Sequence, residues 1–262
     1  MNLNLTGKNA LVCGSTQGLG WATAVELALL GANVTLLARD EAKLQARLAD
    51  LDVRLGQQHG YEVADFSKPD TVRAALERHQ QRVPLTHLLI NNTGGPAGGP
   101  ILDAKPEAFI AAFEAHLICN QLLVQALVPG MKTAGYGRII NVISTSVKQP
   151  LPGLGVSNTI RGAVAQWAKT LAGELGPFGI TVNNVLPGYT RTARLDAVAQ
   201  MRAQASGKSQ EDIEKAMMAD IPVGRFGEAA EFGAAAAFLC TPAAAYINGI
   251  NLPVDGGRTS SL

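Results

Sequence analysis

Short apolar runs alternate with longer segments of helical periodicity along the whole chain. Seven runs have the length and composition of strands, and they lie at residues 9–14, 33–38, 61–66, 87–92, 137–144, 180–187 and 251–257. Helical patterns occupy the intervals, at residues 18–30, 41–51, 69–82, 105–133, 156–175 and 228–239. Strands that are apolar on both faces and separated by helices form a parallel sheet covered by helices on both sides. Because such crossovers are right-handed, the pattern predicts a doubly wound α/β fold.

No linker-like composition divides the 262 residues and no internal repeat is evident, so we expect one domain spanning 1–262. The segment 190–220 is the least core-like, because it is rich in alanine and in charge while keeping a helical pattern. We expect this segment to form a mobile flap over the substrate.

The charge balance excludes several classes of partner. The net charge is +1 with acidic and basic residues interspersed, so the chain has no electrostatic footprint for nucleic acid or an anionic membrane. The start of the chain lacks a basic region followed by an apolar run, which argues against a signal peptide. No uncharged apolar stretch of about 18 residues occurs, which argues against a membrane span. We therefore expect a cytoplasmic protein that acts on a small molecule.

The cysteines and histidines show no metal-ligand spacing. Cys13, Cys119 and Cys240 lie far apart in apolar contexts, which is typical of buried thiols in a reducing compartment. The four histidines, at positions 59, 79, 87 and 116, form no HExxH-like pair. We expect no metal site.

A glycine-rich turn follows the first strand. Gly14, Gly18 and Gly20 stand between that strand and the mouth of the first helix. Such a turn needs residues without a Cβ, and it lets a pyrophosphate approach the backbone closely. The helix N-terminus then offers free N–H groups and a partial positive charge to the anion. The order of strand, glycines, helix and second strand predicts nucleotide binding.

The tip of the second strand predicts which nicotinamide cofactor is preferred. A carboxylate there would bind the ribose diol of NAD and repel a 2′-phosphate, but this chain has Ala38 followed by Arg39. The planar guanidinium of Arg39 can bind a phosphate, so NADP(H) is favoured over NAD(H). The alternative is a solvated surface arginine, and the neighbouring Asp40 complicates the pattern.

Together with the glycine turn GSTQGLG, several further motifs resemble those of the short-chain dehydrogenase/reductase family, over essentially the whole chain. They are, in chain order, ADFS, NNTG, GRIINVIS, NNVLPGYTRT, IPVGRFGEAAEFGAAAAFLC and NGINLPVDGG. The resemblance implies a seven-stranded Rossmann fold assembled as a homo-oligomer, a tetramer or a dimer. Within the family, the chain is similar to the 3-oxoacyl-thioester reductases. It also implies that the cofactor is bound by Gly14, Ser15, Gly18, Leu19, Gly20, Arg39, Asp65, Phe66, Asn92, Thr93, Gly94, Arg161, Pro187, Gly188, Thr190 and Thr192.

The resemblance breaks down at the proton-transfer pair. The family carries a serine at the end of one strand, here Ser144, and a Tyr-x-x-x-Lys pair on the next helix. Anchoring on AKTLAGEL puts Ser157 at the tyrosine position and Arg161 at the lysine position, and no tyrosine occurs between residues 137 and 188. A second departure is His116, where the family usually has an active-site asparagine.

The high pKa of an aliphatic hydroxyl limits what Ser157 can do. To act near neutrality a tyrosine needs its pKa lowered by roughly 3 units, or about 4 kcal/mol. An aliphatic hydroxyl resembles water and would need roughly 12 kcal/mol. We therefore expect Ser157 to donate a hydrogen bond or relay a proton, rather than to act as a free-standing acid or base. Arg161 keeps the positive charge that a lysine would bring and can bind the nicotinamide ribose, but it cannot give up its proton.

Other side chains are candidates for the missing roles. His116 titrates near neutrality in its ordinary state and is a candidate proton donor, although a hydrogen-bonded helix histidine is equally expected. Tyr189, after the Pro-Gly turn, and Lys148, in the loop after the serine strand, are weaker candidates for contacting substrate. The glycines of the loop 94–100 predict a flexible wall beside the nicotinamide.

Three functions remain open at this point. The first is an NADP(H)-dependent oxidoreductase acting on a carbonyl or an alcohol, with altered proton-transfer residues. The second is a nucleotide-binding protein without turnover, acting as a sensor or a partner subunit, because the tyrosine is missing. The third is a different reaction on the same scaffold. Halohydrin dehalogenases resemble the family, but they keep the tyrosine and lose the glycine turn, so they are disfavoured here.

Overall fold

A computed structural model describes residues 1–261. Within these residues, seven strands form one parallel sheet in the order β3-β2-β1-β4-β5-β6-β7, which confirms the predicted doubly wound fold. The strands are β1 (Asn9–Cys13), β2 (Asn33–Ala38), β3 (Gly60–Val63), β4 (Leu88–Asn91), β5 (Gly137–Val142), β6 (Ile180–Pro187) and β7 (Asn251–Val254).

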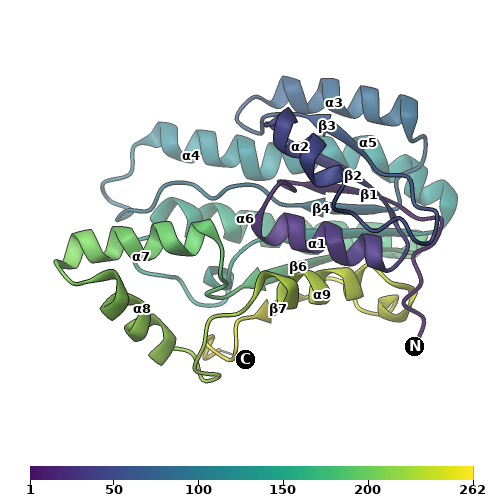
Figure 1. The fold of residues 1–262 in the computed structure, drawn as a ribbon. Helices are drawn as coiled ribbons and strands as arrows, with labels where there is room; N and C mark the ends of the chain where they lie inside the picture. The colour runs from purple at the N-terminus through teal and green to yellow at the C-terminus, as the bar shows by residue number, and fades with distance from the viewer. Residues whose placement is uncertain (262) are drawn as a thin grey trace.

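Helices cover both faces of the sheet (Figure 1). They are α1 (Gly18–Leu29), α2 (Glu41–Leu48), α3 (Pro69–Arg82), α4 (Pro106–Phe113), α5 (Cys119–Ala134), α6 (Gly155–Leu175), α7 (Ala193–Ser206), α8 (Gln210–Ala219) and α9 (Ala229–Leu239). Helices α1, α2 and α9 pack on one face, and α3, α5 and α6 pack on the other.

Successive side chains along each strand point to opposite faces of the sheet, and this divides the hydrophobic core into two clusters. In β1, Ala10 and Val12 belong to the cluster under α1 and α9, whereas Leu11 and Cys13 belong to the cluster under α3, α5 and α6. All four side chains are at most 1% exposed. Because each strand buries both faces, it has to be apolar throughout, and this is the pattern that the sequence shows.

The order in which the chain adds strands to the sheet reverses between β1 and β4. The chain moves outward from β1 to β2 and β3, then returns to pair β4 with the other side of β1. Loops that follow β1 and β4 therefore leave the sheet toward opposite faces and open a crevice at its carboxyl edge. Ligands of such sheets bind at this point.

The predicted helix at 105–133 is interrupted. A π-helical turn, Glu114–Ile118, separates α4 from α5 and contains His116. One extra residue in the turn rotates the following side chains, and it places His116 in the interior with 2% of its surface exposed.

The helical stretch Pro106–Ala134 is long and apolar enough to cross a membrane by length and composition alone. It forms part of the layer that packs on the sheet, and 44% of its most apolar window is buried inside the fold. Core helices of ordinary globular proteins have the same character.

The segment 190–220 is helical as expected, and it forms α7 and α8. Figure 1 shows these two helices beyond one end of the sheet, outside the two covering layers. They have an apolar cluster of their own, in which Leu195 and Ala199 of α7 pack with Met217, Ile221 and Phe226. The mobility of this segment stays a prediction.

A row of asparagines, buried except at the edge strand, joins four strands. The side-chain amide of Asn91 donates to Asn141 (2.8 Å), that of Asn141 to Asn184 (3.0 Å), and that of Asn184 to Asn251 (2.8 Å). These residues are direct partners in the β4–β5, β5–β6 and β6–β7 registers. Because a register slip would leave buried amides without partners, the row fixes how the strand ends align at the carboxyl half of the sheet.

Asn141→Ala should lower the free energy of unfolding by about 2–4 kcal/mol, because two buried amides lose their partner. Asn141 is fully buried, whereas Asn251 is exposed at the edge strand. Asn251→Ala should therefore cost less than about 1 kcal/mol. Urea denaturation of both variants measures the difference, and equal costs would show that the row does not act as described.

Candidate active site

A cavity of about 520 Å³ opens at the carboxyl edge of the sheet. Its walls come from the segments that follow β1, β4, β5 and β6, together with the start of α6 and the inner side of α7. The predicted site residues that line it are Gly14, Gly18, Leu19, Asn92, Thr93, Gly94, Ser144, Ser157, Arg161, Pro187, Gly188, Tyr189, Thr190 and Thr192. The topology thus brings five separated motifs to one cavity of a size suited to small ligands.

The glycine turn is packed against Asn92. The side-chain amide of Asn92 donates to the carbonyl oxygens of Cys13 and Gly14, both at 3.2 Å. A Cβ at Gly14 would lie 2.7 Å from the Asn92 side chain, and a Cβ at Gly20 would lie 2.3 Å from the Gly14 carbonyl oxygen. Only glycine fits at either position, because Asn92 obstructs a Cβ at Gly14, and the Gly14 carbonyl and Asn92 together obstruct one at Gly20.

Gly18 is required by its conformation instead. Its φ is +59°, in the left-handed region, and a Cβ there would meet only ordinary contacts with Thr192. Helix α1 begins at Gly18, its N-cap Gln17 makes no side-chain capping bond, and its first turn has no acidic residue. Gln17, Gly18 and Leu19 all line the cavity, so uncapped N–H groups at this end are available to an anion.

Ser144 follows β5 and its side chain is oriented by the backbone. Its Oγ accepts a hydrogen bond from the Ser146 N–H at 3.1 Å, as the N-cap of the short turn Thr145–Val147. With one lone pair occupied, the hydroxyl proton of Ser144 is free to be donated into the cavity.

Ser157 and Arg161 lie one helical turn apart on the cavity side of α6, exposed by 9% and 8% respectively. The Arg161 guanidinium donates to the Val142 carbonyl oxygen at 3.1 Å, which ties α6 to the end of β5. Burial, and then the positive charge of Arg194, lower the pKa of Arg161 to about 10. Arg161 is therefore a cation at neutral pH, and it carries its charge into the cavity.

His116 does not line the cavity. It is buried, and its Nδ1 has no hydrogen-bond partner among residues 1–261. Burial, reinforced by the charge of Arg161, lowers the pKa of His116 to about 3. The ring is neutral at pH 7, because the site that removes it from water also places it near a cation. Its predicted role as proton donor stays a prediction, and the structure places a neutral imidazole at that position.

The cofactor residues predicted at the adenine end lie outside this cavity. Ser15 is fully buried and its Oγ lies 3.5 Å from the Leu37 carbonyl oxygen. Asp65 accepts two hydrogen bonds from Ser67, which lower its pKa, and Phe66 is 7% exposed within the core. Because the Phe66 ring is packed inside, only its backbone can meet an adenine.

Arg39 is exposed just after β2 and makes no ion pair within residues 1–261. Its neighbour Asp40 is engaged elsewhere. The Asp40 carboxylate caps α2 by accepting from the Lys43 N–H, and it pairs with the Lys43 ammonium at 3.3 Å. These contacts lower the pKa of Asp40 and occupy its carboxylate.

The loops around the cavity contact one another. In the loop 94–100, Gly99 donates to the Gly153 carbonyl oxygen (2.7 Å) and accepts from the Gly155 N–H (3.2 Å). The expected glycine wall is therefore joined to the loop that precedes α6, and its flexibility stays a prediction. Lys148 is half-buried in the preceding turn and is not among the cavity-lining residues.

Several cavity residues were not foreseen. Gln17, Gly95, Arg194, Met201 and Arg202 all line it. Arg194 donates to the Pro96 carbonyl oxygen at 3.0 Å, so α7 lies over the loop 94–100. The sequence signal was present in the charged segment 190–220, but its pattern did not show which arginines face inward.

No group of three or more His, Cys, Asp or Glu side chains that suits a metal ion occurs in residues 1–261. The three cysteines are free and buried, and burial raises the pKa of Cys119 to about 11 and that of Cys240 to about 12. These thiols are protonated packing residues.

A glycine turn at a topological switch point, with a serine, an arginine and a Pro-Gly segment around one cavity, defines a dinucleotide-binding oxidoreductase site. Residues 14–259 match the family described as Enoyl-(Acyl carrier protein) reductase. The 3-oxoacyl-[acyl-carrier-protein] reductase FabG of Pseudomonas aeruginosa is 31% identical over 99% of this chain and 100% of its own length. A tropinone reductase homologue of Arabidopsis thaliana is 32% identical over 98% of this chain and 91% of its own.

Among solved structures, the L-sorbose reductase of Gluconobacter frateurii, complexed with NADPH and L-sorbose, superposes with a TM-score of 0.93. It is 29% identical, and the match covers 100% of both chains. A gluconate 5-dehydrogenase of Burkholderia cenocepacia, in complex with NADP and tartrate, is 29% identical with a TM-score of 0.86, over 100% of this chain and 98% of its own. The chain belongs to the short-chain dehydrogenase/reductase family of oxidoreductases.

Replacing His116 should change how stability depends on pH. The folded-state pKa of about 3 lies below the ordinary value of 6.5, so between these values the unfolded chain binds a proton that the folded chain does not. Stability should therefore fall as pH drops through this window, by about 1.4 kcal/mol per pH unit for this ring. In His116→Asn the fall should be shallower by that amount. Unfolding measured from pH 7 to pH 4 tests this, and parallel curves for the two proteins would contradict it.

Proposed function

We propose that the protein is an NADP(H)-dependent oxidoreductase that interconverts a carbonyl and an alcohol. One observation carries the proposal: Ser144, Ser157 and Arg161 face the same cavity as the glycine turn and the Pro-Gly segment. The solved relatives that bind NADPH or NADP have the same fold over their full length. Their substrates differ, so the resemblance supports the reaction class and leaves the substrate to be argued separately.

The residues present fit a dinucleotide. The uncapped start of α1 at Gly18 offers N–H groups to a pyrophosphate, and Pro187, Gly188, Thr190 and Thr192 line the part of the cavity where a nicotinamide would be held. When bound, the cofactor supplies or accepts the hydride. Arg161 would hold the nicotinamide ribose and add positive charge near the substrate oxygen.

Two hydroxyl groups serve the substrate oxygen. The Ser144 hydroxyl has a free proton to donate, and the Ser157 side chain makes no hydrogen bond within residues 1–261, so its hydroxyl is available to the cavity. Hydrogen bonds from both, with the fixed charge of Arg161 behind them, stabilise the negative charge that develops on a carbonyl oxygen during reduction.

Proton delivery is assigned to water relayed through Ser157. A serine cannot supply the proton on its own, and the His116 imidazole is neutral and outside the cavity. Water bound beside Ser157 can exchange its proton with solvent through the cavity mouth. His116 is then a buried neutral ring near Arg161, whose charge contributes to lowering its pKa.

The preference for NADP(H) over NAD(H) rests on Arg39. Its guanidinium is exposed and unpaired among residues 1–261, while the adjacent Asp40 is occupied by Lys43 and the start of α2. A 2′-phosphate there would meet the Arg39 guanidinium, and the Asp40 carboxylate beside it is already occupied. The homo-oligomeric state implied by the family resemblance remains a proposal.

Arg39→Ala should raise the Kd for NADPH about tenfold or more, because one charge-assisted contact to the 2′-phosphate is lost. The Kd for NADH should stay within about twofold. Titration by fluorescence or calorimetry measures both constants. Arg73→Ala, at an exposed arginine of α3, is the matched control and should change neither. A wild type that binds NADH as tightly as NADPH would contradict the preference.

Ser157→Ala should reduce kcat by about 10-fold to 100-fold, because a hydroxyl aimed at the reacting oxygen is removed. Ser157→Tyr combined with Arg161→Lys should gain activity on simple ketones, because a phenol enters the cavity with a lysine one turn away. Thr159→Ala is the control, since its hydroxyl bonds to Gly155 on the exposed side of the same helix. Rates are followed by NADPH oxidation.

The sensor alternative makes a different prediction in the same experiments. A nucleotide-binding protein without turnover would bind NADPH and oxidise none of it across ketones, β-keto thioesters and quinones. Absence of NADPH binding would remove both functions at once.

A further inference from the structure

Positive charge is concentrated at the substrate end of the cavity. Arg161, Arg194 and Arg202 line the cavity, Arg258 lines a small hollow beside it, and neither is lined by an aspartate or a glutamate. None of these four guanidinium groups pairs with a carboxylate within residues 1–261. Most other exposed arginines of the chain have such a partner, for example Arg191 with Glu228 at 3.2 Å.

Tyr189 holds two of these arginines in place. Its hydroxyl oxygen accepts from Arg202 at 3.0 Å and from Arg258 at 3.1 Å. The guanidinium carbons lie 5.6 Å and 4.2 Å from the centre of its ring. A neutral oxygen that gathers two cations orients them without neutralising them. The repulsion between the neighbouring charges of Arg202 and Arg258 is relieved when an anion binds beside them.

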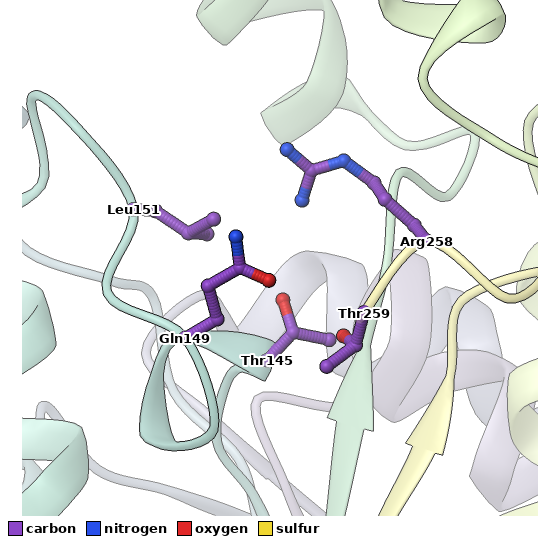
Figure 2. Close-up of a pocket in the computed structure, with 5 residues that line it drawn as sticks. All are labelled: Thr145, Gln149, Leu151, Arg258 and Thr259. Carbon is purple, nitrogen blue, oxygen red and sulfur yellow. The ribbon is translucent and has the colours of Figure 1, made fainter. Parts of the chain in front are cut away.

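The small hollow has the chemistry of an anion site. It measures about 40 Å³ and is lined by Thr145, Gln149, Leu151, Arg258 and Thr259. Figure 2 shows the Arg258 guanidinium turned toward Gln149 and Leu151, with the Thr145 and Thr259 side chains beside them.

The Gln149 amide is oriented as a donor. Its Oε1 accepts from the Ser260 hydroxyl at 3.0 Å, and the opposite end of the amide, Nε2, points into the hollow (Figure 2). The hollow is therefore ringed by a guanidinium, an amide N–H and a threonine hydroxyl, all of which can donate to an anion.

The hollow adjoins the reacting groups. Thr145 directly follows Ser144, and Leu151 lines both the hollow and the main cavity. A molecule with one group bound in the hollow can therefore extend past Leu151 into the cavity that Ser144 and Ser157 line. About 40 Å³ is room for roughly three water-sized atoms, which suits a carboxylate better than a phosphate.

We propose that the substrate is a short oxo acid or hydroxy acid whose carboxylate is bound in this hollow by Arg258 and Gln149, with Arg202 held alongside by Tyr189. The proposal rests on the carbonyl–alcohol function argued above and adds the substrate class. The carboxylate takes no part in hydride transfer, and it fixes the distance between the anchored end and the reacting carbon.

The test compares acids with their neutral esters. NADPH oxidation is measured with oxo acids of three to six carbons whose keto group lies at different distances from the carboxylate, each beside its methyl ester, and with acetoacetyl coenzyme A. At least one acid should exceed its ester in kcat/KM by about tenfold to a hundredfold, the range of a charge-assisted hydrogen-bonded contact.

Arg258→Met should bring that acid down to the level of its ester in the same variant, chiefly through KM. Arg258→Lys should restore part of the preference, because it keeps the charge and loses the fork. Gln149→Leu gives a second, milder loss if Arg258→Met does not fold. Arg191→Met is the matched control, since Arg191 already pairs with Glu228, and it should keep the full preference.

A binding measurement separates this proposal from the proposed reaction. The favoured acid, but not its ester, should raise the melting temperature of the protein–NADPH complex, and Arg258→Met should abolish the difference. This result without NADPH oxidation would sustain the carboxylate site and remove the reaction. Turnover of acid and ester at equal rates would remove the carboxylate site and keep the reaction. A preference for acetoacetyl coenzyme A that depends on Arg258 would assign the hollow to a carrier phosphate and overturn the proposal.

Discussion

The contact between Asn92 and the glycine turn organises everything at the carboxyl edge of the sheet. Two hydrogen bonds of 3.2 Å join the strand β4 to the turn after β1, across the point where the chain reverses direction. Gly14 and Gly20 are glycine because a Cβ at either position would collide at this crossing. The start of α1 is thereby held beside the ends of β4, β5 and β6, where the Ser144 and Ser157 hydroxyls face the same cavity.

Around this frame, the cavity is a positively charged space. Burial and like charge act together: they lower the pKa of Arg161 to about 10 and that of His116 to about 3. An arginine stays charged under such stress, whereas a histidine and a lysine lose their protons far more readily. Arg161 therefore provides a permanent cation in a site that already holds the guanidinium groups of Arg194 and Arg202.

Much of the fold and part of the site followed from the sequence. Strand and helix positions agree to within a few residues, because a sheet buried on both faces requires continuous apolar runs. Gly14, Ser144, Ser157 and Arg161 were placed at one site from motif spacing and resemblance, and all four line the cavity. His116 was expected to titrate near neutrality, but burial at the π-helical turn lowers its pKa to about 3, and no sequence pattern revealed that turn. Its role as a proton donor stays a prediction.

The sequence by itself determined the order of strands and helices, the glycine turn and the four-residue spacing of Ser157 and Arg161, because these are local patterns or fixed intervals along the chain. Only the tertiary structure decided which charges face one another. Tyr189, Arg202 and Arg258 come from three separate segments, and their hydrogen bonds exist because the fold brings α7 and the segment after β7 to the same tyrosine. Contacts between residues so far apart in the chain depend on the packing of the elements that carry them, and periodicity holds no information about that.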